Sequence, residues 1–171
     1  PQPDGTPALS WIAHGVNIKS LPSAYLDFKI SKGCNSGVFF RTSSLKPRPG
    51  KDVGFNGLEM QILDNPGMGM TDTGAIYDLS APTKQMMKPV GEWNHLLMTV
   101  RRGDVTVELN GEVVNHVDLD KFTEKNRRPD GTEHKFDIAY RDHPYKGYIG
   151  LQDHGSPCWF KNIKLKPLGK K

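Results

Sequence analysis

The candidates for acid–base chemistry in this chain are Glu59, His154 and Arg41, each on the polar face of a predicted strand. Alternate residues of an extended strand point to opposite sides. Glu59 therefore shares a face with Gln61, and His154 shares one with Gln152. A carboxylate and an imidazole can exchange protons with a ligand, and a guanidinium can bind a developing negative charge. We expect one site if the three strands are neighbours.

The rim of such a site has five further candidates: Asn35, Asp64, Asp153, Tyr77 and Trp93. A simpler interpretation makes Glu59 and Arg41 a cross-strand ion pair beside a solvated amide face. His154 could likewise be a turn histidine bonded to the backbone. Trp93 and Trp159 are expected in the core rather than as stacking platforms.

The remaining histidines and the cysteines carry weaker signals. We expect five histidines to be exposed in loops or on outward strand positions: His14, His95, His116, His134 and His143. Cys34 and Cys158 lie outside any Cys-x-x-Cys pattern. Two separate buried thiols are favoured over a disulfide between them.

A divalent cation is an alternative way to build the site. Glu59, Asp153 and His154 could ligate one, but none of the recognised ligand spacings is present. We therefore predict no cofactor, with the cation kept as the alternative.

Length and composition favour one domain spanning residues 1–171. Hydrophobic residues make up 36% and charged residues 25%, with 18 glycines and 13 prolines, which is typical of a turn-rich globular chain. The net charge of +4 includes a lysine-rich end, typical of a solvated strand face and tail, so no nucleic-acid partner is implied. No apolar run is long enough to span a membrane. The chain lacks an initiator Met and reads as a mature or trimmed form.

Alternating hydrophobicity and turn residues predict about nine or ten strands and one short helical piece within Lys121–Pro144. The predicted strands are Ala24–Ile30, Gly37–Thr42, Leu58–Leu63, Ala75–Leu79, Trp93–Arg101, Val105–Leu109, Glu112–His116, one within 147–154, and Trp159–Leu165. Residues 1–23 are irregular, with a short strand near Val16–Ile18. These elements favour an all-β, antiparallel two-sheet sandwich.

The order of several short motifs resembles the 3-keto-disaccharide hydrolase family. The motifs are Asn35-Ser36-Gly37-Val38-Phe39-Phe40-Arg41, Glu59-Met60-Gln61-Ile62-Leu63-Asp64, Thr73-Gly74-Ala75-Ile76-Tyr77, Gly91-Glu92-Trp93-Asn94, Leu109-Asn110-Gly111, Gly147 to Gly155, and Trp159-Phe160-Lys161-Asn162-Ile163. The resemblance covers residues 24–166; residues 1–23 do not match the family's usual opening. It implies a concanavalin-like jelly roll, a carbohydrate substrate, and a secreted, periplasmic or cell-surface bacterial protein.

The resemblance also implies action on sugars oxidised at carbon 3. Such a ketone acidifies the hydrogen on carbon 2, so the group on carbon 1 can leave by elimination before water adds back. Glu59 or His154 would be the base, Arg41 the clamp for the enolate, and Asp153 the residue that orients or charges the site. Substrate binding would fall to five residues: Asn35, Gln61, Asp64, Tyr77 and Gln152.

Two other function classes remain open from the sequence. Jelly rolls also serve as non-catalytic, lectin-like carbohydrate-binding modules, and the fold cannot separate the two functions. A purely structural or adhesive domain is disfavoured, because polar groups recur on one predicted face.

Overall fold

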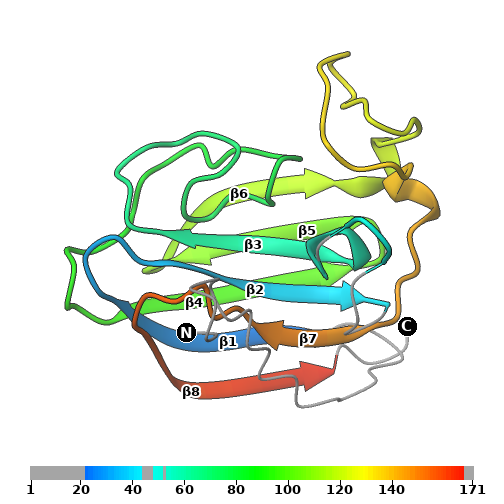
Figure 1. The fold of residues 1–171 in the computed structure, drawn as a ribbon. Coiled ribbons are helices and arrows are strands. Elements are labelled where there is room, and N and C mark those ends of the chain that lie inside the picture. Colours follow the sequence, from blue (N-terminus) through cyan, green and yellow to red (C-terminus); the bar gives the residue numbers. More distant parts are fainter. Residues whose placement is uncertain (1–21, 44–47, 52, 168–171) are drawn as a thin grey trace.

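A computed structural model describes residues 22–43, 48–51 and 53–167 of the chain. Its larger sheet has five antiparallel strands in the order β6-β5-β4-β1-β8 (Figure 1). Their bounds are β1 Pro22–Ile30, β4 Asn94–Arg101, β5 Asp104–Leu109, β6 Glu112–Asp118 and β8 Cys158–Pro167.

The smaller sheet has three antiparallel strands in the order β3-β2-β7 and lies against the larger one (Figure 1). Its strands are β2 Asn35–Thr42, β3 Leu58–Leu63 and β7 Tyr148–Leu151. Three short 3-10 helices join the described elements: η1 Val53–Asn56, η2 Leu119–Lys121 and η3 Tyr140–Asp142. The predicted all-β, two-sheet antiparallel jelly roll is confirmed.

The core fills the space between the sheets with the apolar residues that alternate along each strand. On the smaller sheet, Val38 and Phe40 of β2 and Met60 and Ile62 of β3 are buried. Facing residues of β1, β4 and β5 complete the core, among them Leu26, Phe28, Leu96, Met98, Val105 and Val107. The alternate residues of β2 and β3 therefore face outward from the smaller sheet.

Most predicted strands are present, with bounds shifted by a few residues. The predicted strand Ala75–Leu79 is wrong, because this segment makes only an isolated bridge from Ile76 to Met60 of β3, and another to Ser80. The helical piece expected within Lys121–Pro144 is η3. The predicted strand near Val16–Ile18 lies outside the described residues, and one domain for residues 1–171 stays a prediction.

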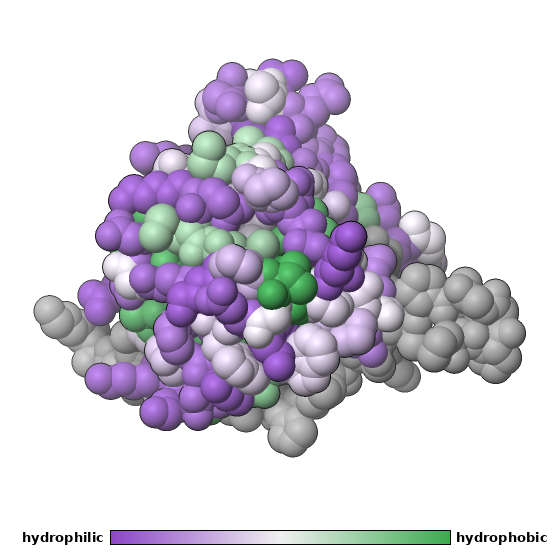
Figure 2. Space-filling view, turned by 90° about the vertical axis from the view of Figure 1, so that its left-hand side faces the viewer, coloured by the Kyte–Doolittle hydropathy of each residue, from purple (hydrophilic) through white to green (hydrophobic). Residues whose placement is uncertain are grey.

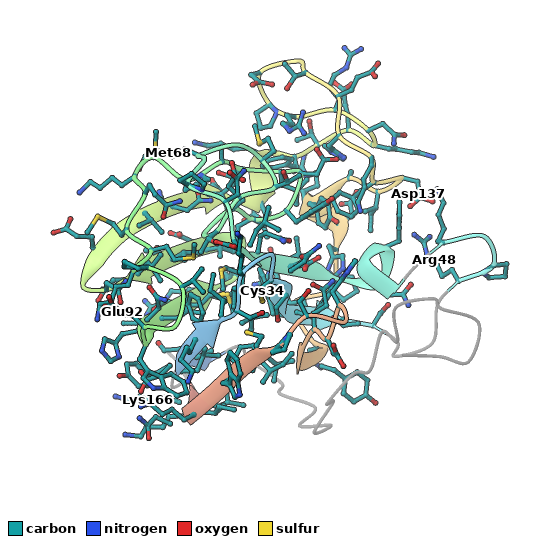
Figure 3. The ribbon with its side chains drawn as sticks, turned by 60° about the vertical axis from the view of Figure 1, so that its left-hand side comes forward. Cys34, Arg48, Met68, Glu92, Asp137 and Lys166 are labelled. Atoms are coloured by element: carbon teal, nitrogen blue, oxygen red, sulfur yellow. The ribbon has the colours of Figure 1, made fainter. Side chains whose placement is uncertain are left out.

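Residues 119–147 form a long arm between β6 and β7, which projects from one end of the sandwich (Figure 1). Its interior is aromatic: Phe136 and Tyr140 pack edge to face with ring centroids 5.4 Å apart. Arg48 and Asp137 lie side by side at the base of the arm (Figure 3), with Arg48 Nη2 2.9 Å from Asp137 Oδ1. This exposed ion pair adds little stability, so the aromatic packing holds the arm in place.

The loop-bearing end of the sandwich is mainly hydrophilic, with small scattered hydrophobic spots (Figure 2). Single exposed hydrophobic residues of this kind are normal on a protein surface. None of the helices found in the described ranges is long and apolar enough to cross a membrane.

The two-sheet core makes a stability prediction. Ile62 is fully buried between the sheets, whereas Ile163 on β8 is 53% exposed. Ile62→Ala should lower the free energy of unfolding by about 2–5 kcal/mol, because it removes buried methyl groups and leaves a cavity. Ile163→Ala should change it by less than about 0.5 kcal/mol. Urea denaturation measures both, and equal losses would contradict the assignment of Ile62 to the core.

Candidate functional site

The register of the smaller sheet brings three outward-facing polar segments together. Phe39 of β2 is paired with Glu59 of β3 on one side and with Gly150 of β7 on the other. Gly37 is paired with Gln61. The three strands are neighbours, which was the condition for a single site.

A cavity of about 140 Å³ lies on this outward face. Six of its lining residues are predicted site residues: Asn35, Glu59, Gln61, Tyr77, Gln152 and His154. The other three are Phe39, Gly54 and Lys135. Pockets for drug-sized ligands occupy about 300–1,000 Å³, so this cavity can enclose only a small part of a larger ligand, such as a single ring.

The Glu59 side chain lies flat against β2 because residue 37 is a glycine. A Cβ at position 37 would lie 2.3 Å from Glu59 Oε1 and 2.9 Å from Glu59 Cγ, so any larger residue would displace the carboxylate. On the other side of β3, the Tyr77 backbone N–H donates to the Glu59 carbonyl oxygen over 2.9 Å. The backbone at Glu59 is thus held between β2 and the segment that carries Tyr77.

Two glutamines supply the amides of the cavity. Gln61 is buried and its Nε2 donates to Asn35 Oδ1 over 2.9 Å. The Gln152 backbone N–H donates to the Gly37 carbonyl over 2.9 Å, which extends the pairing beyond the end of β7. Among the described residues, the buried Gln152 Oε1 has no hydrogen-bond donor. The Gln152 side chain lines the cavity, so its carboxamide can hydrogen-bond a ligand hydroxyl group.

His154 and Asp153 follow β7 but differ in their surroundings. His154 is exposed and lines the cavity. Asp153 is exposed outside the cavity lining, and its Oδ1 accepts a 2.9 Å hydrogen bond from the Gly155 backbone N–H. The local turn thus orients Asp153, and only His154 is placed to reach a ligand in the cavity.

Arg41 does not reach the cavity, so its predicted position is wrong. Its backbone adopts a left-handed φ of 52°, and the β2–β7 register shifts between Phe39 and Thr42. Gly147 permits this bend, because a Cβ there would lie 2.5 Å from the Arg41 carbonyl carbon.

The bend breaks the strand alternation and sends the Arg41 side chain to the end of the sandwich. Its Nη2 donates to the Arg102 carbonyl, and its guanidinium lies 4.8 Å from the centre of the Tyr145 ring. Burial lowers the pKa of Arg41 to about 10, so the guanidinium stays charged at neutral pH. This charge supports the junction of β2 with the β4–β5 turn.

Asp64 and Trp93 also lie elsewhere. Asp64 Oδ2 accepts a 2.7 Å hydrogen bond from the Gly33 backbone N–H and closes the turn before β2. Trp93 lies with Lys161 at the opposite sheet, where Lys161 Nζ is 3.8 Å from the ring centre. Trp159 is 44% exposed, and Trp93 is only half-buried, so the expectation that both tryptophans lie in the core is wrong.

Two histidines expected at the surface are buried in the arm instead. His134 is 4% exposed and packs among the rings of Phe122, Phe136 and Tyr140, and His143 stacks on Tyr140. Burial lowers the pKa of both imidazoles. His95 and His116 are exposed as predicted, and His14 lies outside the described residues.

The two cysteines are free thiols, as expected, but they are not separate. A hydrogen bond between the thiols lowers the pKa of Cys34, and the same contact together with burial raises the pKa of Cys158. Cys34 lies inside the sandwich (Figure 3), and Cys158 is half-buried.

The proposed cation ligands do not gather. Within the described part of the chain, no group of three or more His, Cys, Asp or Glu side chains could hold a metal ion. Glu59, Asp153 and His154 therefore do not form the cation site that was kept as the alternative.

Lys135 is the cavity residue that the sequence did not indicate. It comes from the arm, within a stretch that has no strand or helix period, and reaches the cavity by tertiary packing. Its ammonium lies 4.5 Å from the centre of the Tyr77 ring, a cation–π contact. No local sequence signal distinguishes it from other lysines.

Together, the fold and the cavity define a jelly-roll domain with an open polar cavity on the outward face of its smaller sheet. Residues 23–166 match the family described as the 3-keto-alpha-glucoside-1,2-lyase-like domain. The chain belongs to this family.

A curated relative supports the same placement. A Bacteroides thetaiotaomicron protein named 3-keto-disaccharide hydrolase is 30% identical over 165 residues, which cover 84% of this chain and 57% of that protein. The chain thus spans little more than half the length of this relative.

Solved structures share the fold. A candidate glycosyl hydrolase from Parabacteroides distasonis has a TM-score of 0.79 at 34% identity, over 87% of this chain and 79% of its own. A second candidate glycosyl hydrolase from the same organism has a TM-score of 0.69 at 26% identity. The match covers 90% of this chain and 73% of that protein's chain. The carbohydrate-binding module CBM66 from Bacillus subtilis has a TM-score of 0.53 at 14% identity. The match covers 92% of this chain and 81% of that module, and at this identity it shows a shared fold alone.

The buried histidines of the arm predict a pH dependence of stability. Because burial lowers their pKa in the folded state, the unfolded chain binds more protons as the pH falls below about 6.5. Stability should therefore be complete above this pH and fall as the pH drops below it, by up to about 1.4 kcal/mol per pH unit for each histidine.

Thermal unfolding of wild type and of the His134→Asn/His143→Asn double variant measures this effect. Asn keeps a polar atom near each Nδ1 and cannot take up a proton, so the double variant should show a flatter dependence. The exposed control His116→Asn should keep the wild-type slope. An unchanged slope in the double variant would refute the link between these imidazoles and acid stability.

Proposed function

We propose that this chain cleaves glycosidic bonds in sugars that carry a ketone at carbon 3, with the reacting ring in the cavity on the smaller sheet. The observation that carries the proposal is the Glu59 carboxylate lying flat over Gly37, in a cavity that also contains His154. The family description and the name of the curated relative support this choice of substrate class.

The chemistry needs a base, an acid and binding groups for hydroxyls. Glu59 takes the proton from carbon 2, and the electron pair of that C–H bond forms the enolate with the ketone. The enolate then expels the group on carbon 1, and His154 protonates its oxygen as it leaves. Water adds to carbon 1 of the resulting enone, and a proton returns to carbon 2.

The number of carboxylates in the cavity supports elimination over ordinary glycoside hydrolysis. Retaining and inverting glycosidases generally use two carboxyl groups on either side of the scissile bond. Among the described residues that line this cavity, Glu59 is the one carboxylate, and Asp153 is turned to Gly155. A single carboxylate suffices where a ketone already makes carbon 2 acidic.

The amides define how the sugar ring is held. The Gln152 carboxamide hydrogen-bonds a ring hydroxyl, and Asn35 and Gln61 present a second polar pair across β2 and β3. Tyr77 forms part of the wall beside Glu59. The small volume fits the oxidised ring and leaves the departing group outside the cavity.

A non-catalytic carbohydrate-binding module is the competing function. The likeness in fold to CBM66 motivates it, but the lining offers little aromatic surface for stacking. Phe39 is buried, and Tyr77 is half-buried beside Lys135. A binding module also has no need for the close fit between Gly37 and Glu59.

We also propose that the protein acts outside the cytoplasm of a bacterium, as a secreted, periplasmic or cell-surface protein, with a carbohydrate as its partner and no nucleic acid. Fractionation of the native host would place it, and recovery in the cytoplasm would refute this part of the proposal.

The role of Glu59 predicts a loss of turnover without a loss of binding. Glu59→Gln should lower kcat for a 4-nitrophenyl 3-keto-glucoside by at least about 100-fold, because the amide cannot accept the proton from carbon 2. Glu92→Gln is a matched control on an exposed loop outside the cavity (Figure 3), and it should keep wild-type kcat. Absorbance of released 4-nitrophenol measures both.

Calorimetry with the same sugar separates the two function classes. Retained binding by Glu59→Gln with lost turnover supports an enzyme. Binding without turnover by wild type, across native and 3-keto disaccharides, supports the binding module and overturns the enzymatic proposal.

The contact between Gly37 and the Glu59 carboxylate predicts an effect on kcat that depends on the presence of Glu59. Gly37→Ala forces the Glu59 carboxylate to move, so kcat should fall about 10-fold or more. In a Glu59→Gln background the same change should have little further effect, because both substitutions act through one group. Additive losses in this double-mutant cycle would contradict the positioning of Glu59 by Gly37.

A further inference from the structure

We propose that Lys135 contacts the oxygen on carbon 3 of the bound sugar and stabilises the enolate that forms when Glu59 removes the proton, an inference that rests on the function proposed above. The mechanism requires a positive group at this oxygen, because negative charge develops there. Arg41, the sequence-based candidate, lies at the end of the sandwich.

Lys135 is the one lysine or arginine among the described residues that line the cavity, which it shares with Glu59. A cation and a carboxylate that reach a ligand from separate elements can act on neighbouring atoms of one ring. Carbon 2 and the carbon 3 oxygen are such neighbours in a 3-keto-sugar. This separation of base and cation suits proton abstraction next to a ketone.

Aromatic rings hold the ammonium of Lys135 without any conventional hydrogen-bond acceptor from the described residues. Its Nζ lies 4.5 Å from the centre of the Tyr77 ring, 5.0 Å from Phe55 and 5.3 Å from Phe136. Such cation–π contacts are favourable for an ammonium group. Within the described ranges, Lys135 Nζ makes no hydrogen bond or ion pair with a protein acceptor. Its N–H donors are therefore available to an oxygen of the ligand.

The backbone of Lys135 is fixed to the segment that borders Glu59. Its N–H donates to Asp78 Oδ2 over 2.7 Å. The neighbouring residue Tyr77 donates its own N–H to the Glu59 carbonyl. The adjacent residues Tyr77 and Asp78 therefore hold the backbones of both the proposed base and the proposed cation, Tyr77 through its N–H and Asp78 through its carboxylate.

Arg128 strengthens this attachment of the arm. Its Nη2 lies 2.5 Å from Asp78 Oδ1, and its Nε donates to the Asp78 carbonyl over 3.1 Å. The Arg128 side chain is 9% exposed, so the pair is largely shielded from solvent. The arm thus carries Lys135 to the cavity on a fixed support, as a site that stabilises charge requires.

The proposed step balances without a further reactant. The C–H bond at carbon 2 breaks, its proton goes to Glu59, and its electron pair forms the carbon 2–carbon 3 double bond. The ketone π pair moves to the carbon 3 oxygen, where the Lys135 ammonium donates a hydrogen bond. When the carbonyl re-forms, that electron density moves back and expels the group on carbon 1.

The test uses the whole chain, a 4-nitrophenyl 3-keto-glucoside, and a 3-keto-1,5-anhydrohexitol that has no leaving group. Exchange of the carbon 2 hydrogen of the second compound in D₂O, followed by NMR, reports enolate formation alone. Lys135→Met removes the charge at similar length. Lys51→Met is the matched control, because Lys51 Nζ also lies over the Phe55 ring, at 4.5 Å, but does not line the cavity.

We expect Lys135→Met to lower kcat and the exchange rate about 100-fold or more, with a change in KM below about threefold. Lys51→Met should keep both rates, and Lys135→Arg should recover part of them. Recovery by arginine also excludes an imine between Lys135 and the ketone, because a guanidinium does not form one.

Wild-type rates in Lys135→Met, or a loss confined to KM, would overturn the role of Lys135 and leave the proposed function intact. A wild-type protein that neither cleaves nor exchanges these compounds would overturn both. Thermal unfolding of each variant shows whether it is folded. If Lys135→Met is unfolded, a folded Lys135→Gln variant takes its place in the test. We expect Lys135→Gln to show the same loss of kcat and exchange rate. Wild-type rates in Lys135→Gln would overturn the role of Lys135.

Discussion

The antiparallel pairing of β2 with β3 and β7 is the contact on which the candidate site depends. It fixes which side chains share the outward face of the smaller sheet, and it places Glu59 over Gly37 and the Gln152 backbone beside the same glycine. A shift of one residue would turn Glu59 and Gln61 into the core. The buried Met60 and Ile62 make that shift costly, so the core of the sandwich also secures the chemistry on its surface.

The second requirement is the attachment of the arm. Residues 119–147 have little regular structure, yet their aromatic interior and the Asp78–Arg128 pair bring Lys135 to the cavity. The base thus comes from a sheet and the cation from a loop. A scaffold of this kind can keep the base constant while changes in the arm alter what it binds.

Strict alternation of apolar and polar residues predicted β2, β3 and β7 from the sequence. It also predicted the polar residues on their outward face: Glu59, Gln61, Gln152 and His154. Arg41 was placed wrongly by the same rule, because alternation holds only while the backbone stays extended. Its left-handed φ depends on the approach of Gly147, which is remote in sequence. Tyr77 was predicted for the site, but on a strand that proved to be a single bridge.

The sequence by itself determined the two-sheet fold, the polar face of the smaller sheet and most of the residues on it, because these follow from local alternation and turn residues. The tertiary structure decided which basic side chain lies beside these residues in the cavity. Arg41 and Lys135 are both basic residues whose places depend on contacts with distant segments, the Arg102 carbonyl for one and Asp78 for the other. No local pattern encodes such contacts, since they form only when the sheets and the arm have packed.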